Sequence, residues 1–520
     1  MKKIVLTTML ATAPILLSAQ SAIDAYNLSA NDLKGTARFM SMGGAFGALG
    51  GDLSTLNQNP AGIGVYRGSE IGVTLDLDIQ LTKTNSMGET SNADQTKFYC
   101  NNFGYVGSVK LDSEVMPFFS WGATYSRVAS FDRLYKGYIP SLSTSMTNYI
   151  ADFSNGYAPS ELLETSNYNP YWDSNADWLS ILAYNTYMIN PVGNSSTYNG
   201  LFQNGTTGDA YFNVRERGYV DEYSINFGGN ITNTVYWGIG FGITDLDYIN
   251  ETFYDEELTN ARIANANADG TVTGNAYFNI DNLNRVTGTG FNFKAGLIVK
   301  PINELRLGLA VHTPTYYDLR HEYDAVSEYS YSTGYDDWTY TDLAYFESKL
   351  NTPWRIIASA AGVFGGRAII SFDYEYLAYN DMLVKDNWGD EYDDVNSDID
   401  NYFKASNIFR VGAEYRLTPT VSLRAGYNYQ TTNVNENAAD GRDYIYTSGT
   451  NPSYTFDKTT QYITCGLGYR YKGFYIDGAY VYKNRKSTFN AFSPFDSNQH
   501  PIAKVSDNNH SIVMSVGFKF

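Results

Sequence analysis

Strict alternation of apolar and polar residues is the main pattern of this chain. In the stretch 69–83, six large apolar side chains from Ile71 to Leu81 occupy every second position, and Asp76 and Asp78 fall between them. A period of two residues predicts a β-strand with one apolar and one polar face. Six apolar side chains on one face need a dry surrounding, whereas carboxylates on the other need water or partners. A strand this long fits a membrane-spanning barrel, with lipid outside and a polar lumen inside, better than a soluble sandwich.

The pattern recurs and predicts about fourteen strands, joined by links that are alternately short and long. The short links have one to four residues and the long ones more than ten. Outer-membrane barrels have tight periplasmic turns and long outer loops. We therefore predict an all-β fold, a 14-stranded antiparallel transmembrane β-barrel with both termini periplasmic and the long loops extracellular. The predicted strands are 69–83, 97–111, 116–131, 218–231, 234–248, 287–300, 304–318, 352–364, 367–380, 405–417, 420–432, 459–472, 474–485 and 509–520.

Both ends of the chain agree with export to an outer membrane. Two lysines, an apolar core over 4–17 and a small-residue site predict a signal peptide over 1–19. The apolar core is too short for the alternative, a transmembrane helix. The final strand ends on Phe520, as in the sorting signal that the barrel-insertion machinery reads. We therefore expect that machinery as a partner during biogenesis.

Composition excludes some functions and supports the membrane interpretation. The net charge of −19 is unsuited to nucleic acid, which requires basic patches. The 46 tyrosines suit the aromatic girdles of a barrel. Cys465 falls on an apolar strand face, where it acts as a small hydrophobe; the alternative is a disulfide with Cys100. No spacing of histidines, cysteines or carboxylates predicts a catalytic group, a metal or a cofactor, and we expect none.

The glycine-rich stretch 35–62, before the first strand, predicts a plug. A barrel of fourteen strands encloses a lumen, which would leak if it were empty. Glycines allow close approach of the backbone to the wall, and Phe39, Met42 and Phe46 are apolar side chains that could meet a ligand. We predict that residues 20–68 form a hatch inside the barrel formed by 69–520, whose largest outer loop is 132–217. Because these residues precede the first strand, we expect the hatch to enter at the periplasmic mouth, the end with the short turns. A nucleotide loop is excluded, because the glycine spacing is wrong and no strand precedes it.

The hatch ends in Asn59-Pro60-Ala61-Gly62, and this tetrapeptide together with the strand count resembles the FadL family. That family comprises outer-membrane transporters for long-chain fatty acids and other hydrophobic compounds, with a fourteen-stranded barrel, an N-terminal hatch and an Asn-Pro-Ala motif in the hatch. The stretches 288–314, 371–382 and 407–429 are also similar, whereas the loops depart freely. The resemblance implies a gating role for Asn59, Pro60, Ala61 and Gly62.

Candidate ligand contacts lie in the lumen and in the largest loop. By strand parity Arg306, Arg410 and Arg424 face the lumen, where a cation could bind a carboxylate. Alternatively, they pair with lumen carboxylates, for which the candidates are Asp373, Glu375 and Glu414. Trp178 and Leu182 belong to a predicted helix over 175–190, and in the family an outer loop holds a low-affinity site. The alternative is that this loop packs on itself.

The third predicted strand carries an irregularity. The alternation of 116–131 would turn Arg127 towards lipid, and a bulge near Ser126 would re-aim the chain. The resemblance implies an inward kink here, because the family has a lateral opening in its third strand. The simpler interpretation, which we favour, is that Arg127 lies above the bilayer.

These features predict a monomeric passive importer of hydrophobic solutes, and the resemblance points to long-chain fatty acids. The expected partners are the outer-membrane bilayer and a hydrophobic small molecule. A diffusion porin would need an open lumen, which the plug argues against. The main alternative is a surface receptor, an adhesin or a haem-binding barrel that uses the tyrosine-rich outer loops.

Overall fold

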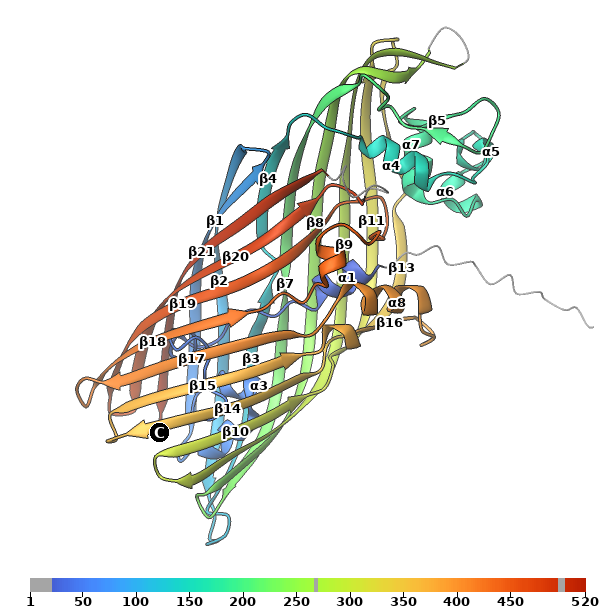
Figure 1. The fold of residues 1–520 in the computed structure, drawn as a ribbon. Helices are drawn as coiled ribbons and strands as arrows, with labels where there is room; N and C mark the ends of the chain where they lie inside the picture. Colours follow the sequence, from blue (N-terminus) through green and yellow to red (C-terminus); the bar gives the residue numbers. More distant parts are fainter. Residues whose placement is uncertain (1–20, 266–269, 494–500) are drawn as a thin grey trace, which may run out of the picture.

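A closed antiparallel β-barrel forms most of the molecule (Figure 1). The structure is a computed structural model that describes residues 21–265, 270–493 and 501–520; the predicted signal peptide lies outside these residues. The first and last strands pair from Glu70 opposite Lys519 to Asn85 opposite Lys504, which closes the ring. The predicted fourteen-stranded barrel is confirmed. Its strands are β1 (Glu70–Ser86), β2 (Glu89–Lys110), β3 (Phe118–Ser130), β7 (Thr207–Ile231), β8 (Val235–Ala264), β9 (Thr271–Ile302), β10 (Leu305–His312), β14 (Arg355–Phe364), β15 (Ala368–Leu377), β17 (Ser406–Arg416), β18 (Val421–Gln430), β19 (Tyr454–Tyr471), β20 (Phe474–Asn490) and β21 (Ile502–Lys519).

The strands continue well beyond the predicted spans at the end of the barrel with the long links. The predicted long link 84–96 is wrong, because β1 and β2 meet in a tight turn at Met87 and Gly88. Links 249–286 and 486–508 are likewise shortened by strand extension. Outside the membrane the outer face of the strands is no longer apolar, so the lipid-facing pattern ends while the backbone pairing goes on. Shorter strands at this end are β4 (Arg133–Ile139), β11 (Tyr316–Tyr331), β12 (Asp336–Tyr340), β13 (Ala344–Asn351) and β16 (Leu383–Asp386).

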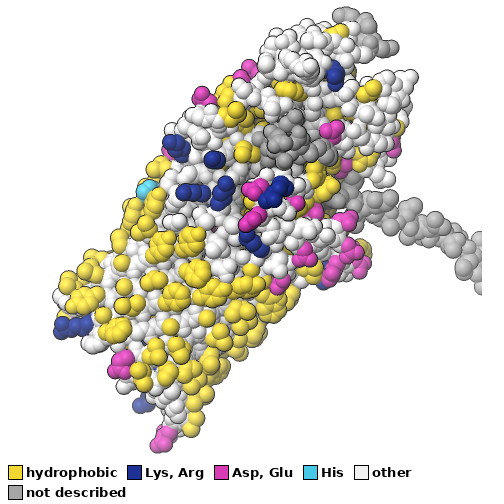
Figure 2. All heavy atoms as spheres, viewed as in Figure 1, with side chains coloured by type: hydrophobic (Ala, Val, Ile, Leu, Met, Phe, Trp, Pro, Cys, Tyr) yellow, Lys and Arg dark blue, Asp and Glu magenta, His cyan; other side chains and the backbone are white. Residues whose placement is uncertain are grey.

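The two faces of the strands divide as the alternation predicts. On β1, Ile71 and Leu81 are exposed on the outside, whereas Asp76 is fully buried inside. Asp76 accepts hydrogen bonds from Lys34 at 2.7 Å and from Asn101 at 3.0 Å. Exposed apolar side chains form a belt around the lower part of the barrel in the view of Figure 2. This belt marks the lipid-facing surface, on the half that carries the short turns.

The hatch fills the barrel and is built of short helices joined by irregular turns. Asp52 Oδ1 accepts from Ser54 N at 3.0 Å at the start of the third helix. None of the helices in the described residues is long and apolar enough to cross a bilayer. The hatch helices are α1 (Ala22–Leu28), α2 (Ala37–Ser41), α3 (Thr55–Gln58) and the 3₁₀ helix η1 (Pro60–Val65).

The hatch begins at the opposite end of the lumen from the one predicted. We expected it to enter at the mouth with the short turns, but α1 packs under the long links. Tyr26 stacks on Phe403 with ring centroids 5.0 Å apart, and Asp24 accepts from Ser448 Oγ at 2.6 Å. The chain then descends, so that Ser69 N donates to the carbonyl of Phe520 at 2.8 Å. Order along the chain does not fix this direction, since both ends of the lumen are open to a segment that precedes the first strand.

Glycines on the lumen face of the strands allow the hatch backbone to lie directly on the wall. A Cβ atom on Gly426 would lie 2.2 Å from Gly43 N, and one on Gly238 would lie 2.1 Å from the carbonyl oxygen of Pro60. Real Cβ atoms do not come this close, so these positions exclude any side chain while the hatch is in place. On β8, glycines on the lumen face alternate with apolar residues on the outer face. The glycines therefore form a surface on which the hatch binds.

We expect Gly238→Val to displace the hatch. Overpacking costs about 1–3 kcal/mol, and more where backbone must move, as it must at Pro60. The measurement is limited proteolysis with trypsin, which should cut at Lys34 or Arg38 faster in the variant by severalfold. Gly478→Val is the matched control, because a Cβ at that position meets nothing within 4 Å. Equal cutting rates in the two variants would contradict the role of Gly238.

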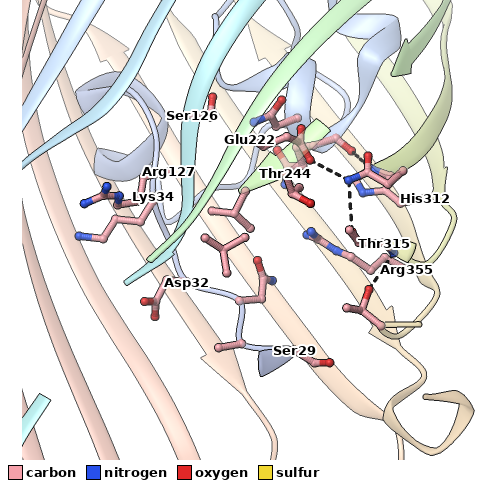
Figure 3. Close-up of a pocket in the computed structure, with 18 of the residues that line it drawn as sticks. Ser29, Asp32, Lys34, Ser126, Arg127, Glu222, Thr244, His312, Thr315 and Arg355 are labelled. Carbon is pink, nitrogen blue, oxygen red and sulfur yellow. Dashed lines mark hydrogen bonds between the residues drawn. The ribbon is translucent and has the colours of Figure 1, made fainter. Parts of the chain in front are cut away.

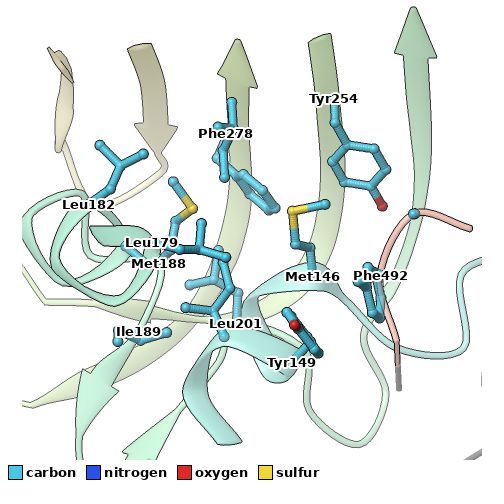
Figure 4. Close-up of a cluster of buried hydrophobic side chains, with 14 of the residues drawn as sticks. Met146, Tyr149, Leu179, Leu182, Met188, Ile189, Leu201, Tyr254, Phe278 and Phe492 are labelled. Carbon is cyan, nitrogen blue, oxygen red and sulfur yellow. The ribbon is translucent and has the colours of Figure 1, made fainter. Parts of the chain in front are cut away.

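A helical lobe built from the largest loop lies over the long-link end of the barrel (Figure 1). Its core is a cluster of buried side chains that includes Tyr254 and Phe278 from the extended strands and Phe492 from the last link (Figure 4). The lobe contains α4 (Met146–Phe153), α5 (Pro159–Leu162), α6 (Pro170–Asp173), α7 (Trp178–Asn185), β5 (Asn190–Pro191) and β6 (Tyr198–Asn199). The remaining links contribute η2 (Tyr379–Asp381), α8 (Asp393–Tyr402) and α9 (Glu436–Ala439).

Candidate functional site

The Asn-Pro-Ala-Gly segment joins the hatch to the barrel wall. Asn59 Oδ1 accepts from Ala61 N at 3.0 Å and so caps η1, whose first residue is Pro60. Asn59 Nδ2 donates to the carbonyl of Gly47 at 2.6 Å. Gly62 N donates to the carbonyl of Asn59, and its own carbonyl accepts from Gly51 N. The four residues are buried, so they hold two turns of the hatch together against the wall.

A carboxylate on the wall holds the glycine-rich turn of the hatch. Asp373, on β15, accepts from the backbone N–H groups of Phe46 and Gly47, each at 2.9 Å, and from Gln58 Nε2 at 2.9 Å. All three donors belong to the hatch and all are buried. The alternation of the strand predicted that Asp373 faces the lumen, but we considered it only as a partner for an arginine. This anchor was missed because backbone donors leave no signal in a sequence.

The apolar hatch residues predicted to meet a ligand are packed rather than free. Met42 and Phe46 are fully buried, and both belong to a cluster with side chains of the wall. Phe39 lies in the same cluster and also lines a cavity. In this conformation only Phe39 of the three borders open space.

The three predicted lumen arginines all point inward, and two of them are paired. Arg424 bonds Glu414 at 2.7 Å and Asp477 at 2.6 Å, and the hatch joins this network through Arg38, which bonds Glu414 at 2.9 Å. Arg410 bonds Glu375 at 2.5 Å. Arg306 instead donates to the carbonyl of Leu49 at 2.8 Å. The alternative of pairing with lumen carboxylates is therefore realised at Arg410 and Arg424.

Two cavities of about 130 Å³ each flank the hatch segment that follows α1. The first lies against β7, β8, β9, β10 and β14 (Figure 3). The second lies closer to the long links, where Tyr26 and Phe131 border it. Ala30, Asn31 and Asp32 line both cavities. A wall of three residues therefore separates them. A third cavity, of about 250 Å³, lies at the short-turn end beside Arg306.

Charged pairs surround the first cavity. Lys34 of the hatch bonds Asp76, Arg127 bonds Asp221 at 2.8 Å, Lys294 bonds Glu222, and Arg355 bonds Glu375 at 2.6 Å. Leu28, Leu33, Val128 and Leu377 add apolar surface. Sequence reasoning missed Lys34, Lys294 and Arg355 as site residues, although parity already placed Lys294 on the lumen face. Each of the four cations comes from a different segment, so only the closed barrel brings them together.

Asp32 fastens the dividing wall to the barrel. It binds Lys483 of β20 and accepts from Tyr462 Oη at 3.2 Å, while Asp32 N donates to the carbonyl of Val128 at 3.3 Å. Burial by itself raises the pKa of this carboxyl, but Lys483 and Lys34 outweigh burial and lower it to about 2. Asp32 is therefore charged at neutral pH, and its attachment is lost only as the pH falls from about 4 towards 2.

The third barrel strand turns inward where the sequence predicts an irregularity. Pairing of β2 with β3 ends at Asn102 and Ser126, whereas β3 continues along β7 with a register shift between Arg127 and Ala129. Both oxygens of Asp221 accept from Arg127, at 2.8 and 2.9 Å. The predicted bulge is present. Arg127 borders the first cavity (Figure 3). Its position above the bilayer, the interpretation that we favoured, stays a prediction.

The predicted loop residues do not form an open surface. Trp178 and Leu182 are both on α7 and are buried in the core of the lobe. The alternative that the loop packs on itself is therefore the observed one. The exposed apolar side chains of the lobe are Leu163, Trp172 and Val192. Periodicity identified the helix, but which face it covers depends on strands far away in the sequence.

The described residues contain neither a cluster of metal ligands nor a disulfide. No three histidine, cysteine, aspartate or glutamate side chains gather there as a metal would require. Cys100 and Cys465 are free thiols, so the alternative disulfide is not formed. Cys465 is exposed on the lipid-facing side of β19, as expected for a small hydrophobe.

The fold and the filled lumen define a class, the plugged fourteen-stranded barrels of outer membranes. Among solved structures, the chain is similar to a FadL homologue of Pseudomonas aeruginosa, with a TM-score of 0.53 and 13% identity over 94% of this chain and 99% of the other. It also aligns with the Pseudomonas putida toluene transporter TodX, with a TM-score of 0.48 and 14% identity over 94% and 99% of the two chains. No family model matches the chain, and no curated protein does. The resemblance to FadL-type barrels is thus confirmed for the fold.

Proposed function

We propose that this protein is a passive importer that carries hydrophobic solutes with an acidic group, most directly long-chain fatty acids, across the outer membrane. The observation that supports this most is a pair of arginines that share one carboxylate beside the first cavity. Arg355 and Arg410 both bond Glu375, so two guanidinium groups share this one carboxylate. A carboxylate is the natural partner for a guanidinium, because it can accept two hydrogen bonds at once.

The state of Arg410 strengthens this proposal. Its Nε and Nη1 atoms are buried without a hydrogen-bond partner among the described residues, and Gly44 of the hatch lies against its Cδ atom. Buried donors without partners cost free energy. Movement of the hatch would uncover them, and an acidic headgroup would satisfy them. The side chain of Arg355 is 22% exposed and offers the first contact.

The cavity volumes indicate that transport requires the hatch to move. Pockets for small molecules usually hold at least roughly 300 Å³, more than twice the volume of either cavity. Displacement of the segment 30–32 would join the two. A solute would then pass from the long-link end to the arginine pair and leave inward or sideways past β3. The segment is held mainly by Asp32, so its contacts are few enough to break and reform.

We expect Arg355→Gln with Arg410→Gln to weaken fatty-acid binding at least tenfold, because the headgroup loses both guanidinium partners. The measurement is displacement of a fluorescent long-chain fatty acid from the refolded protein. The matching long-chain alcohol should bind the native protein and the variant about equally, since it carries no charge. Arg442→Gln is the control, because Arg442 is exposed and bonds only Asp440 among the described residues.

Competitors decide between the proposal and its main alternative, a surface receptor or haem-binding barrel. Exposed tryptophans at the long-link end, Trp172, Trp338 and Trp388, are the observation that favours the alternative. Displacement by unlabelled fatty acid but not by hemin or a small sugar supports the importer. Displacement by hemin with the spectrum of bound haem would support the receptor instead.

A further inference from the structure

Four lysines lie on the outer surface of the barrel, away from the lumen. They are Lys458 on β19, Lys486 on β20, Lys504 on β21 and Lys83 on β1, and all four are exposed. Lys83 and Lys486 lie opposite the same residue, Ser506, from its two sides. Lys504 is two positions further along β21 on the same face. Lys458 falls at a register shift beside Thr459, which is opposite Lys486. We call these four residues the lysine row.

The lysine row lies just beyond the lipid-facing belt. On β21, the exposed apolar side chains of Ile512 and Met514 come first. Polar pairs follow, with Tyr480 bonded to His510 and Tyr482 to Asn508, each at 2.7 Å. The lysines come next. Figure 2 shows this order as basic side chains gathered above the apolar belt. Aromatic girdles mark the level of lipid headgroups in barrels, so the lysine row lies at or directly above that level, on the long-link side.

The lysine row has no carboxylate partners within the described chain. Two arginines on the outer surface of this end are paired, Arg285 with Asp247 at 3.2 Å and Arg320 with Glu322 at 2.8 Å. No carboxylate among the described residues lies within 4 Å of the four lysines. Asp94 of β2 is on the same face, opposite Leu81, and is their acidic neighbour along the sheet. Neighbouring like charges repel, so an anion supplied from outside would stabilise the row.

We propose that the lysine row binds the phosphate groups of a phosphorylated glycolipid in the outer leaflet. The membrane is the anion source in contact with this face, and lysine is a common point-charge ligand for phosphate. Clusters of basic residues next to a bilayer attract anionic headgroups. The side chains of Asn484 and Asn508 lie between the belt and the row, and Ser506 lies within the row; all three are polar groups that can bond headgroup hydroxyls. The proposal depends on the outer-membrane location but not on the imported solute.

The test is native mass spectrometry of the full barrel titrated with diphosphoryl lipid A. We expect Lys83→Gln with Lys486→Gln and Lys504→Gln to weaken binding at least tenfold. Monophosphoryl lipid A should bind the native barrel more weakly than the diphosphoryl form, and millimolar inorganic phosphate should compete only partly. If a phosphate-free glycolipid binds as well as diphosphoryl lipid A, or if the triple variant binds like the native barrel, the proposal is overturned.

The control variant changes Lys110, Lys136 and Lys300 to glutamine and so removes the same charge elsewhere. It should bind diphosphoryl lipid A within twofold of the native barrel. Equal weakening in the two variants would show a general charge effect and would also overturn the proposal. Heat-modifiable mobility in gels reports that each variant is folded. Should the triple variant not fold, Lys486→Gln alone is expected to weaken binding about threefold. Since fatty-acid displacement is measured separately, failure of either proposal leaves the other standing.

Discussion

Replacing Asn59 by alanine and Pro60 by serine is expected to reduce uptake of a fluorescent long-chain fatty acid severalfold while the barrel still assembles. The side chain of Asn59 makes two bonds within the hatch, one to Ala61 N and one to the carbonyl of Gly47. Loss of a helix cap costs about 0.5–2 kcal/mol. The carbonyl of Gly47 would also stay buried without this donor, at roughly 1–3 kcal/mol. The two turns would no longer be held in one arrangement.

Uptake is measured in Gram-negative cells that lack their own importer, and assembly is measured by heat-modifiable mobility. The barrel should assemble because neither residue belongs to a strand. Asn92→Ala is the control, since Asn92 is exposed on the outer face of β2. Normal uptake in the double variant would count heavily against a gating role of the hatch.

Asp373→Ala is expected to release the glycine-rich turn and open an ion path through the lumen. Phe46 N, Gly47 N and Gln58 Nε2 would all lose this acceptor. Gly47 N would then be unpaired, whereas Phe46 N and Gln58 Nε2 would each keep a bond to the carbonyl of Gly44. Each buried donor left unpaired costs roughly 1–3 kcal/mol. Asp373→Asn should destabilise the turn less than Asp373→Ala, because the amide of asparagine keeps one oxygen acceptor.

Single-barrel conductance in planar bilayers measures this effect. We expect the alanine variant to conduct in large steps at least tenfold more often than the native barrel, with the asparagine variant between them. Asp318→Ala is the control, because Asp318 is exposed on the outer face of β11. Conductance at the native level in Asp373→Ala would mean that this carboxylate does not hold the plug.

Fold prediction succeeded where a residue's environment is set by the membrane. Lipid on one side and a polar lumen on the other impose a period of two on each strand independently, so Ile71 and Asp76 reveal their faces without knowledge of any other strand. The same rule placed Arg306, Arg410 and Arg424 in the lumen. It failed in the extensions of β8 and β9, where water replaces lipid. The outer face there is polar, and the buried face, with Tyr254 and Phe278, packs in the core of the lobe instead of facing a polar lumen.

Three-dimensional pairing decided what the lumen can do. That Arg355 and Arg410 share Glu375, or that Asp373 anchors the hatch, depends on which strands are neighbours and on their register. These relations cannot be inferred from the alternation of residues along the sequence. The burial of Trp178 and Leu182 also depends on tertiary structure, since α7 is covered by strands that are distant in the chain.

By itself, the sequence determined a plugged fourteen-stranded barrel and the inward or outward direction of most strand residues. Tertiary structure alone decided that the hatch begins under the long links, that three residues divide the lumen into two cavities, and that an arginine pair borders one of them. The physical reason is one of range. Alternation records the contact of each residue with its solvent, which is local, whereas cavities and charge pairs are formed by segments that meet only when the ring closes.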